Sequence, residues 1–361
     1  MSDKIETKNK DNLARVDFKN KEKIVFPNDF ISKAEVHSIL SNNFGKISDN
    51  WFKFVFAWNY NAYKTFHDMD KYLILIFLIQ KSFKHYSETY RVFSEEEFYS
   101  SREFQIEKIN LIEIADELLI PKETIRRKIN ELQDENIVLR VGKKIVIKPL
   151  AFTQQRPRHT IKQMSSFLSL CSKFLATETW FGEPIKSEDI EAFTRKYFTL
   201  VWRFFFRFKI PFLVRQRKFY GDLETFIVAG SVYINHVHRL KEKVRDNPIK
   251  VANSVNDYGE ASYTKWMKFI VTTKEKIVGI NASSIAEITG VPRATVIRKL
   301  KQIEKKNILV KDNKQLYTIG KHYKNNLKNL EAMMIENQID LCKFVSIFFD
   351  LYKNNVLRDL K

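Results

Sequence analysis

An internal repeat is the feature that most constrains the fold of this chain. When residues 109–149 are placed on residues 280–320, an offset of 171 positions without a gap, 11 of 41 positions are identical. Many of the others stay chemically similar, and the hydrophobic phase is matched throughout. The chain is therefore expected to contain two copies of one small structural module.

Each copy has the pattern of a helix, a tight turn, a second helix and a β-hairpin. In the second copy, Gly290 suits the left-handed residue that ends a helix, and Pro292 suits the first turn of the next one. Apolar residues at helical spacing follow at Val296, Leu300 and Ile303. Strands are predicted at 308–311 and 316–319.

The first copy follows the same course with one departure. Its second helix carries Ile125, Ile129 and Leu132, and its strands are predicted at 137–141 and 145–148. Leu119 stands where the second copy has Gly290. A non-glycine residue in the left-handed region costs about 1 kcal/mol, so we expect the first turn to have a different shape.

The string SIAEITGVPRATVIRKLKQIE, residues 284–304, resembles the winged helix-turn-helix of bacterial regulators. It is most similar to the IclR and Crp groups, where x-x-I-A-x-x-T-G-[VL]-[PS]-x-x-T-V-x-R-x-L is typical. The resemblance covers about 45 residues twice, roughly a quarter of the chain. It implies that the second helix of each copy enters the major groove of double-stranded DNA while the wing lies along the backbone.

Composition and a weaker echo upstream extend this organisation to the whole chain. Scarce Gly (9) and Pro (8) favour helices. Trp58 is paired with Trp202, and the apolar run from Lys71 resembles residues 224–232. The predicted fold is mainly α with small β-hairpin wings: two winged helix-turn-helix modules on an aromatic-rich helical scaffold, by internal duplication. The predicted parts are a flexible tail (1–25), a helical scaffold, first half (26–105), winged helix 1 (106–150), the second half of the scaffold (151–270) with a linker at about 241–262, winged helix 2 (275–320) and a C-terminal amphipathic helix (321–361).

Helix geometry identifies the face of each second helix that lies opposite its apolar stripe. Arg127 and Arg298 lie there, and an arginine can bond two atoms of one guanine. Thr124 and Thr295 are short enough to reach a phosphate or a thymine methyl group, and basic residues at the helix start and in the wings suit phosphates. The predicted DNA-binding residues are Lys122, Glu123, Thr124, Arg126, Arg127, Asn130, Arg140, Lys143 and Lys144 in copy one, and Arg293, Ala294, Thr295, Arg298, Lys301, Lys311 and Lys314 in copy two.

The two copies differ in charge. Over the matched 41 residues copy one has 8 basic and 7 acidic residues, whereas copy two has 8 and 3. Copy two is therefore the stronger candidate for DNA contact, and copy one is a candidate for weaker DNA binding or for protein contact. Glu123 and Arg127 are also spaced to form a simple surface ion pair.

The whole chain is strongly basic. Its 62 Lys+Arg and 43 Asp+Glu residues give a net charge of +19, which favours a polyanionic partner. The abundance of Lys, Asn, Ile and Phe is also what an AT-rich genome produces, so part of the excess is compositional.

Several function classes find no support in the sequence. Two cysteines without metal-ligand spacing indicate free thiols in a reducing cytoplasm. The charged N-terminus lacks a signal-peptide pattern, and the longest apolar run, 72–79, is too short to span a membrane. There is no Gly-rich phosphate loop, and the pair His236 and His238 has no carboxylate cluster beside it. We expect no enzyme activity, no cofactor, no metal and no membrane partner.

These observations together predict a cytoplasmic, nucleoid-associated transcriptional regulator whose two tandem modules form an intramolecular pseudo-dimer. A plasmid-type replication initiator and a winged-helix protein-interaction scaffold are the alternatives. The C-terminal helix is expected either to pack on the scaffold or to mediate a homo-oligomer. The sequence does not define a small-molecule effector.

Overall fold

The computed structural model describes residues 31–89, 91–101, 103–106, 110–141, 144–149, 156–176, 182–246, 277–320 and 327–359. Its described residues are mainly helical, with two small antiparallel sheets, as the sequence predicts. The expected tail, 1–25, lies outside the described residues. The expected linker at about 241–262 was wrong at its start, because the last helix before it runs through Asp246 and ends before Pro248. Lys and Glu at 241–243 are good helix formers.

Three helices begin the described chain, and the second and third contribute many buried residues to its core. Helix α2 ends at His67, whose φ of 51° is left-handed. The side chain of Asp68 then caps the next helix by accepting a hydrogen bond from the Lys71 backbone N–H at 2.8 Å. The three helices are α1 (Lys33–Asn42), α2 (Phe44–Phe66) and α3 (Met69–Glu88).

A second series repeats these helices 154 residues later. Gly221 takes the left-handed corner with a φ of 97°. Asp222 accepts a hydrogen bond from the Thr225 backbone N–H at 2.7 Å, as Asp68 does at the first corner. The members of this series are α8 (Ser187–Lys196), α9 (Phe198–Tyr220) and α10 (Leu223–Asp246), so that α8 and α9 match α1 and α2 in both length and position.

The aromatic residues of α2 and α9 form the core between the two series. The indoles of Trp58 and Trp202 stack with centroids 5.8 Å apart, and Phe205 lies 4.5 Å from Trp58. Trp58 and Trp202 occupy different positions in their helices, so their pairing in the sequence was wrong; Phe212 is the residue of α9 that corresponds to Trp58. The run of aromatics in α9 is buried and serves as core.

A small module follows each series. Both copies contain two short helices and a hairpin, and their helix bounds differ by 171 residues throughout. In the first, a third strand completes the sheet in the order β1-β3-β2, and in the second an isolated bridge between Ile280 and Tyr317 takes that place. The elements are β1 (Phe104–Ile106), α5 (Leu111–Leu118), α6 (Lys122–Asp134), β2 (Val138–Val141) and β3 (Lys144–Ile147), then α13 (Ala282–Thr289), α14 (Arg293–Lys305), β4 (Leu309–Lys311) and β5 (Tyr317–Ile319). A short helix, α4 (Glu95–Ser100), precedes β1.

The turn at Leu119 has the same left-handed geometry as the turn at Gly290, so the expected difference in shape was wrong. The φ angles are 52° and 77°, and both backbone N–H groups bond back to the helix, to Ala115 and to Ala286. Leu119 is held there by Arg217, whose Nη1 donates to its carbonyl oxygen at 2.9 Å. Tertiary contact thus keeps a strained residue in place.

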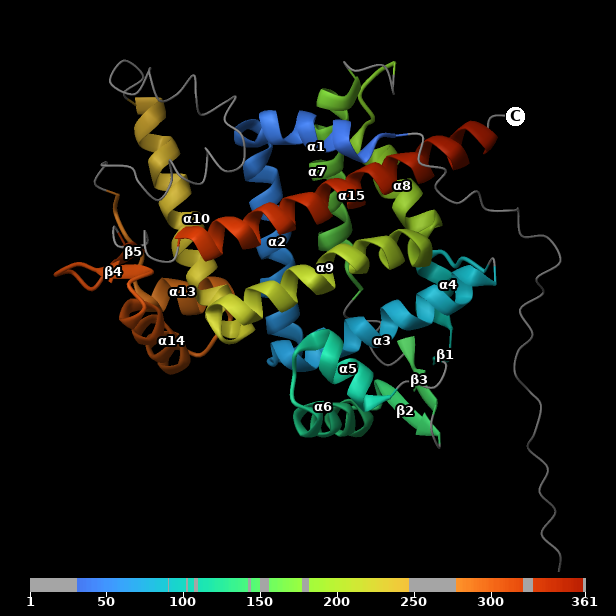
Figure 1. Cartoon of the computed structure of the whole chain (residues 1–361), viewed down its shortest axis with the longest axis horizontal. Helices are drawn as coiled ribbons and strands as arrows, with labels where there is room; N and C mark the ends of the chain where they lie inside the picture. Colours follow the sequence, from blue (N-terminus) through green and yellow to red (C-terminus); the bar gives the residue numbers. More distant parts are fainter. Residues whose placement is uncertain are drawn as a thin grey trace, which may run out of the picture.

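Two outer helices cover the core in a reciprocal way. Helix α7 (Arg158–Ala176) packs on α2 and also on α8 of the second series. Helix α15 (Leu327–Asp359) packs on α9 and also on α1 of the first series. The apolar stripe of α15 is buried in this way, and Gln338, which interrupts it, donates to Ser41 Oγ. The C-terminal helix therefore packs on the scaffold (Figure 1).

Candidate nucleic-acid interface

Helices α6 and α14 lie at the periphery of the molecule with one face free. In Figure 1 α14 lies at the lower left with the hairpin β4–β5 beside it, and α6 lies at the bottom with the hairpin β2–β3 to its right. Helix α6 packs against α3, and α14 packs against α10. The predicted apolar stripes face inward, and their members are buried: Ile125, Ile129 and Leu132 in α6, and Val296, Leu300 and Ile303 in α14.

A buried lysine fixes each of these helices to the scaffold, and sequence reasoning missed both. Lys128 Nζ lies 2.6 Å from a carboxylate oxygen of Asp68, and Lys299 bonds Asp222 in the same way. The two aspartates are the residues that cap α3 and α10. Identical lysines on the apolar side of both copies, at 128 and 299, were the signal that could have revealed this anchor.

Charge chemistry supports the anchor. Burial lowers the pKa of Lys128, but the hydrogen bonds to Asp68 and Glu131 outweigh it, so the pKa is raised overall. Burial likewise works against the charged form of Asp222, yet hydrogen bonds from Lys299 and Thr225 leave its pKa lowered. The pKa shifts of Lys128 and Asp222 both favour the charged form, and each helix is held by a charge-assisted hydrogen bond.

The outer face of α6 has mixed charge. Arg126 is paired with Glu123, with Nη2 and Oε2 2.6 Å apart, and Arg127 lies 4.0 Å from Glu131. Glu123, which is also spaced to pair with Arg127, therefore pairs with Arg126 instead. The helix has four basic and three acidic residues. Of its predicted contact residues, Lys122, Glu123, Arg126, Arg127 and Asn130 are exposed, and Thr124 is half-buried.

The outer face of α14 is almost purely basic. The helix has five basic residues and one acidic residue. Arg293 is the first residue of α14, and its Nε donates to Ser283 Oγ of α13 at 2.9 Å. Arg298 and Lys301 have no ion pair within the described part of the chain. Arg293, Ala294, Arg298 and Lys301 are exposed, and Thr295 is half-buried.

The two hairpins add basic side chains at the outer ends. Lys311 and Lys314 are exposed on a turn that Asp312 holds by accepting from the backbone N–H groups of Lys314 and Leu316 at 2.9 and 2.8 Å. Arg140 and Lys144 are exposed on the other hairpin. Lys143 lies outside the described residues.

Reciprocal contacts between the two series fix the modules relative to each other. Arg217, at the end of α9, bonds both Asp70 of α3 and the turn of the first module. The backbone N–H of Met69 donates to Glu224 of α10 at 3.1 Å. Lys64, at the end of α2, packs against Gly290 in the turn of the second module. The end of each core helix thus supports the module of the other series.

Comparison with known proteins gives no assignment: no family model, curated protein or solved structure matches this chain. Within the described residues, no helix is long and apolar enough to cross a membrane. The same residues contain no group of three His, Cys, Asp or Glu side chains placed to hold a metal ion. Cys171 and Cys342 are buried free thiols, and burial raises the pKa of both.

Proposed function

We propose that this chain is a sequence-specific double-stranded DNA-binding transcriptional regulator that uses two tandem winged helices as an intramolecular pseudo-dimer. The observation that carries the proposal is a pair of equivalent helices, α6 and α14, each with an exposed polar face and a buried lysine anchor. Their matched bounds, 171 residues apart, support an internal duplication of the module. The reciprocal contacts support a fixed geometry between the two.

In the proposed complex, α14 and α6 enter two successive major grooves, which lie about 34 Å apart along the duplex. Arg298 reads a guanine through two hydrogen bonds, and Lys311 and Lys314 contact phosphates. The pseudo-two-fold arrangement of the halves favours an imperfect inverted repeat as the target. A replication initiator of the plasmid type would instead select direct repeats near its own gene.

The two proposed half-sites contribute unequally to the affinity for DNA. The net charge of α14 is strongly positive, whereas the acidic residues of α6 nearly cancel its basic ones. Phosphate neutralisation dominates the salt-dependent part of DNA affinity. The half-site read by α14 therefore supplies most of the affinity, and the half-site read by α6 adds discrimination.

Selection of genomic fragments with the purified chain tests the proposal. We expect one enriched motif with two unlike halves and retardation that weakens steeply with added salt. Arg298→Ala should relax the preference at one base pair at a cost of about 1–3 kcal/mol. Lys311→Ala should weaken all sequences alike and lower the salt slope by about 1.

Lys162→Ala is the matched control, because Lys162 is exposed on α7, away from both modules. It should leave the preference and the salt slope unchanged. The absence of both an enriched motif and salt-sensitive retardation would overturn the proposal that the chain is a DNA-binding regulator. Identical behaviour of the Arg298 and Lys311 variants would show that the groove assignment is wrong.

A further inference from the structure

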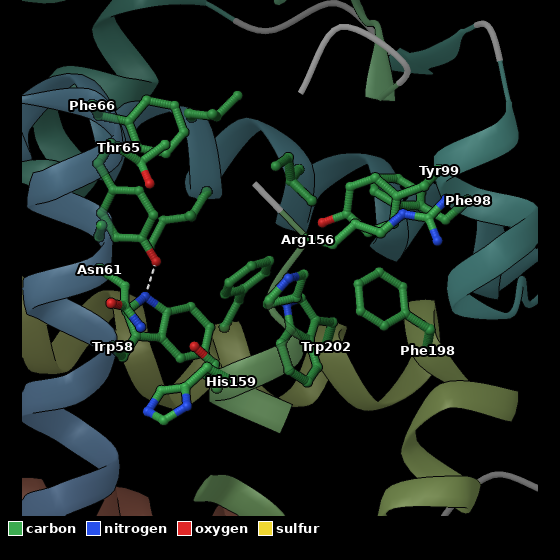
Figure 2. A pocket seen from close by; sticks show the side chains of 18 of the residues that line it. Trp58, Asn61, Thr65, Phe66, Phe98, Tyr99, Arg156, His159, Phe198 and Trp202 are labelled. Carbon is green, nitrogen blue, oxygen red and sulfur yellow. Dashed lines mark hydrogen bonds between the residues drawn. The ribbon is translucent and has the colours of Figure 1, made fainter. Parts of the chain in front are cut away.

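A cavity of about 320 Å³ lies between α2, α3, α7 and α9. Figure 2 shows it from close by, with the rings of Trp58, Trp202 and Phe198 on one side and those of Phe98 and Tyr99 on another. These five aromatic residues are buried. The volume falls in the range of small-molecule sites, which are mostly apolar with a few polar groups.

The equivalent place in the second half of the molecule is largely filled. A cavity of about 80 Å³ remains there, lined by α9 and α10 residues that correspond to the first cavity at the offset of 154, such as Phe212 for Trp58 and Gln216 for Ala62. Met333 and Met334 of α15 line it. The Phe56 ring occupies the space beside Gly230, where a Cβ would collide with it. Side-chain packing therefore fills most of this space in the second half of the molecule, whereas the equivalent space in the first half stays open.

Polar groups meet the open cavity on one side and at its mouth. Arg156 lies over the Tyr99 ring with its guanidinium carbon 5.1 Å from the centroid. Its two terminal nitrogens donate to Glu96 at 2.8 and 3.4 Å, whereas its Nε is buried and has no hydrogen-bond partner among the described residues. An unpaired buried donor costs about 1–3 kcal/mol. Lys64 and His159 are exposed at the lining of the same cavity.

We propose that this cavity binds a small planar aromatic acid. The rings of the protein take the planar body of the ligand by stacking and edge contacts. The acid group accepts from the terminal N–H groups of Arg156 that Glu96 does not use, and the positive charge of Lys64, another lining residue, adds to the attraction. The cation of Arg156 is already neutralised in part by Glu96, so the ring system supplies most of the affinity and the acid group supplies selectivity.

The cavity is linked to both modules through α3 and Lys64, so its occupancy bears on the geometry of α6 and α14. Helix α3 forms one wall, and its cap Asp68 anchors α6 through Lys128. Lys64 belongs to the lining and also packs against Gly290 beside α14. Ligand control of DNA binding follows from these contacts, and this consequence rests on the proposed function.

Titration of the purified chain with 2-naphthoate tests the site without DNA, with protonated 2-naphthylmethylamine as the isosteric cation. We expect saturable quenching of tryptophan fluorescence by 2-naphthoate, a higher midpoint of thermal unfolding, and binding at least about tenfold tighter than that of the cation. Arg156→Gln should remove most of this preference. Arg158→Gln, which removes the same charge from an exposed position outside the cavity, should change the affinity by less than about twofold.

Filling the cavity should abolish binding. Ala62→Met places a longer side chain inside it, and Thr65→Phe blocks the mouth should the first variant fail to fold. No saturable binding of 2-naphthoate, equal or tighter binding of the cation, or binding that survives both filling variants would each overturn the proposal. A retardation assay with and without 2-naphthoate then tests the coupling, and loss of DNA binding altogether would leave the binding result intact.

Discussion

Lys209 shows how far the aromatic core departs from an ordinary apolar interior. Its side chain is 1% exposed, its ammonium group donates to Asn59 Oδ1 at 3.0 Å, and the Trp58 and Phe212 rings lie 5.3 and 5.2 Å away. The two rings favour the charged form. No carboxylate bonds it among the described residues, and burial lowers the pKa of Lys209 to about 7.

This lysine should make the stability of the protein depend on pH. Because its pKa is near 7 in the folded chain and 10.5 in the unfolded one, the unfolded chain holds an extra proton between these values, so the free energy of unfolding rises with pH by up to about 1.4 kcal/mol per unit. Lys209→Met should remove this rise in denaturant titrations at pH 7, 8 and 9. Lys53→Met, at an exposed site, should keep it; equal slopes for both variants would contradict the prediction.

Leu119 is a second residue whose surroundings determine how much it contributes to the stability of the protein. It is 53% exposed and left-handed, so its side chain contributes little packing while its backbone is strained. Leu119→Gly should stabilise the protein by about 1 kcal/mol in denaturant titrations. Leu139→Gly, at an exposed strand position of the same module, should destabilise it. Destabilisation by both would show that the Leu119 side chain packs more than its exposure indicates.

At the scale of elements, anchoring of α6 and α14 depends on buried charge rather than on apolar packing alone. Lys128 has a side chain 9% exposed, whereas the pair of Arg126 and Glu123 is 60% and 71% exposed. Removing Lys128 leaves the Asp68 carboxylate, which also caps α3, without its buried cation. The surface pair can be lost without such a penalty, since exposed pairs contribute little.

Lys128→Met should therefore cost about 1–3 kcal/mol of unfolding free energy, and Arg126→Met should stay within about 0.5 kcal/mol. Chemical denaturation of the two variants measures both values. Hydrogen exchange adds a local readout, because Lys128→Met should speed exchange of α6 amides before those of α2. Equal losses for the two variants would mean that the buried lysine is not an anchor.

The helix–turn–helix–hairpin order of both modules was predictable from sequence because it rests on local signals: Pro121 and Pro292 at helix starts and apolar residues at helical spacing. The match of α1–α3 with α8–α10 was predicted only as a weak echo and with Trp58 placed on the wrong residue, because it is carried by helix lengths and corner residues such as Asp68 and Asp222 rather than by identical core residues. The outer face of α6 was predicted as exposed, and Glu123, whose spacing also allowed a pair with Arg127, is paired with Arg126. The cavity could not be foreseen, since it depends on how four helices leave space between them.

At the scale of the whole molecule, the reciprocal contacts fix two modules in one body. Arg217 bridges α9 to the first module, and Lys64 connects α2 to the second. A pair of modules joined by a loose linker would tolerate variable half-site spacing, whereas a fixed pair would not. In the proposed complex with DNA, the core helices would therefore set the spacing between the two half-sites.

This geometry predicts a strict spacing between the half-sites of the selected DNA. Insertion of 5 base pairs between them rotates one half-site to the opposite side, and insertion of 10 moves it one full turn away. Both should weaken binding by about 100-fold or more, to the level of one half-site alone, in a retardation assay. Retained affinity with the 10-base-pair insertion would show that the modules move independently.

The pairing of α1 with α15 has a consequence for synthesis. The backbone N–H of Ile31 donates to Asp350, and Ser346 donates to the Ile31 carbonyl, across more than 300 residues. During synthesis, the surfaces of α1 and α9 that α15 covers stay exposed until α15 has been made. Long-range closure of this kind is slow and leaves apolar surface exposed, so we expect the nascent chain to be prone to aggregation until α15 docks.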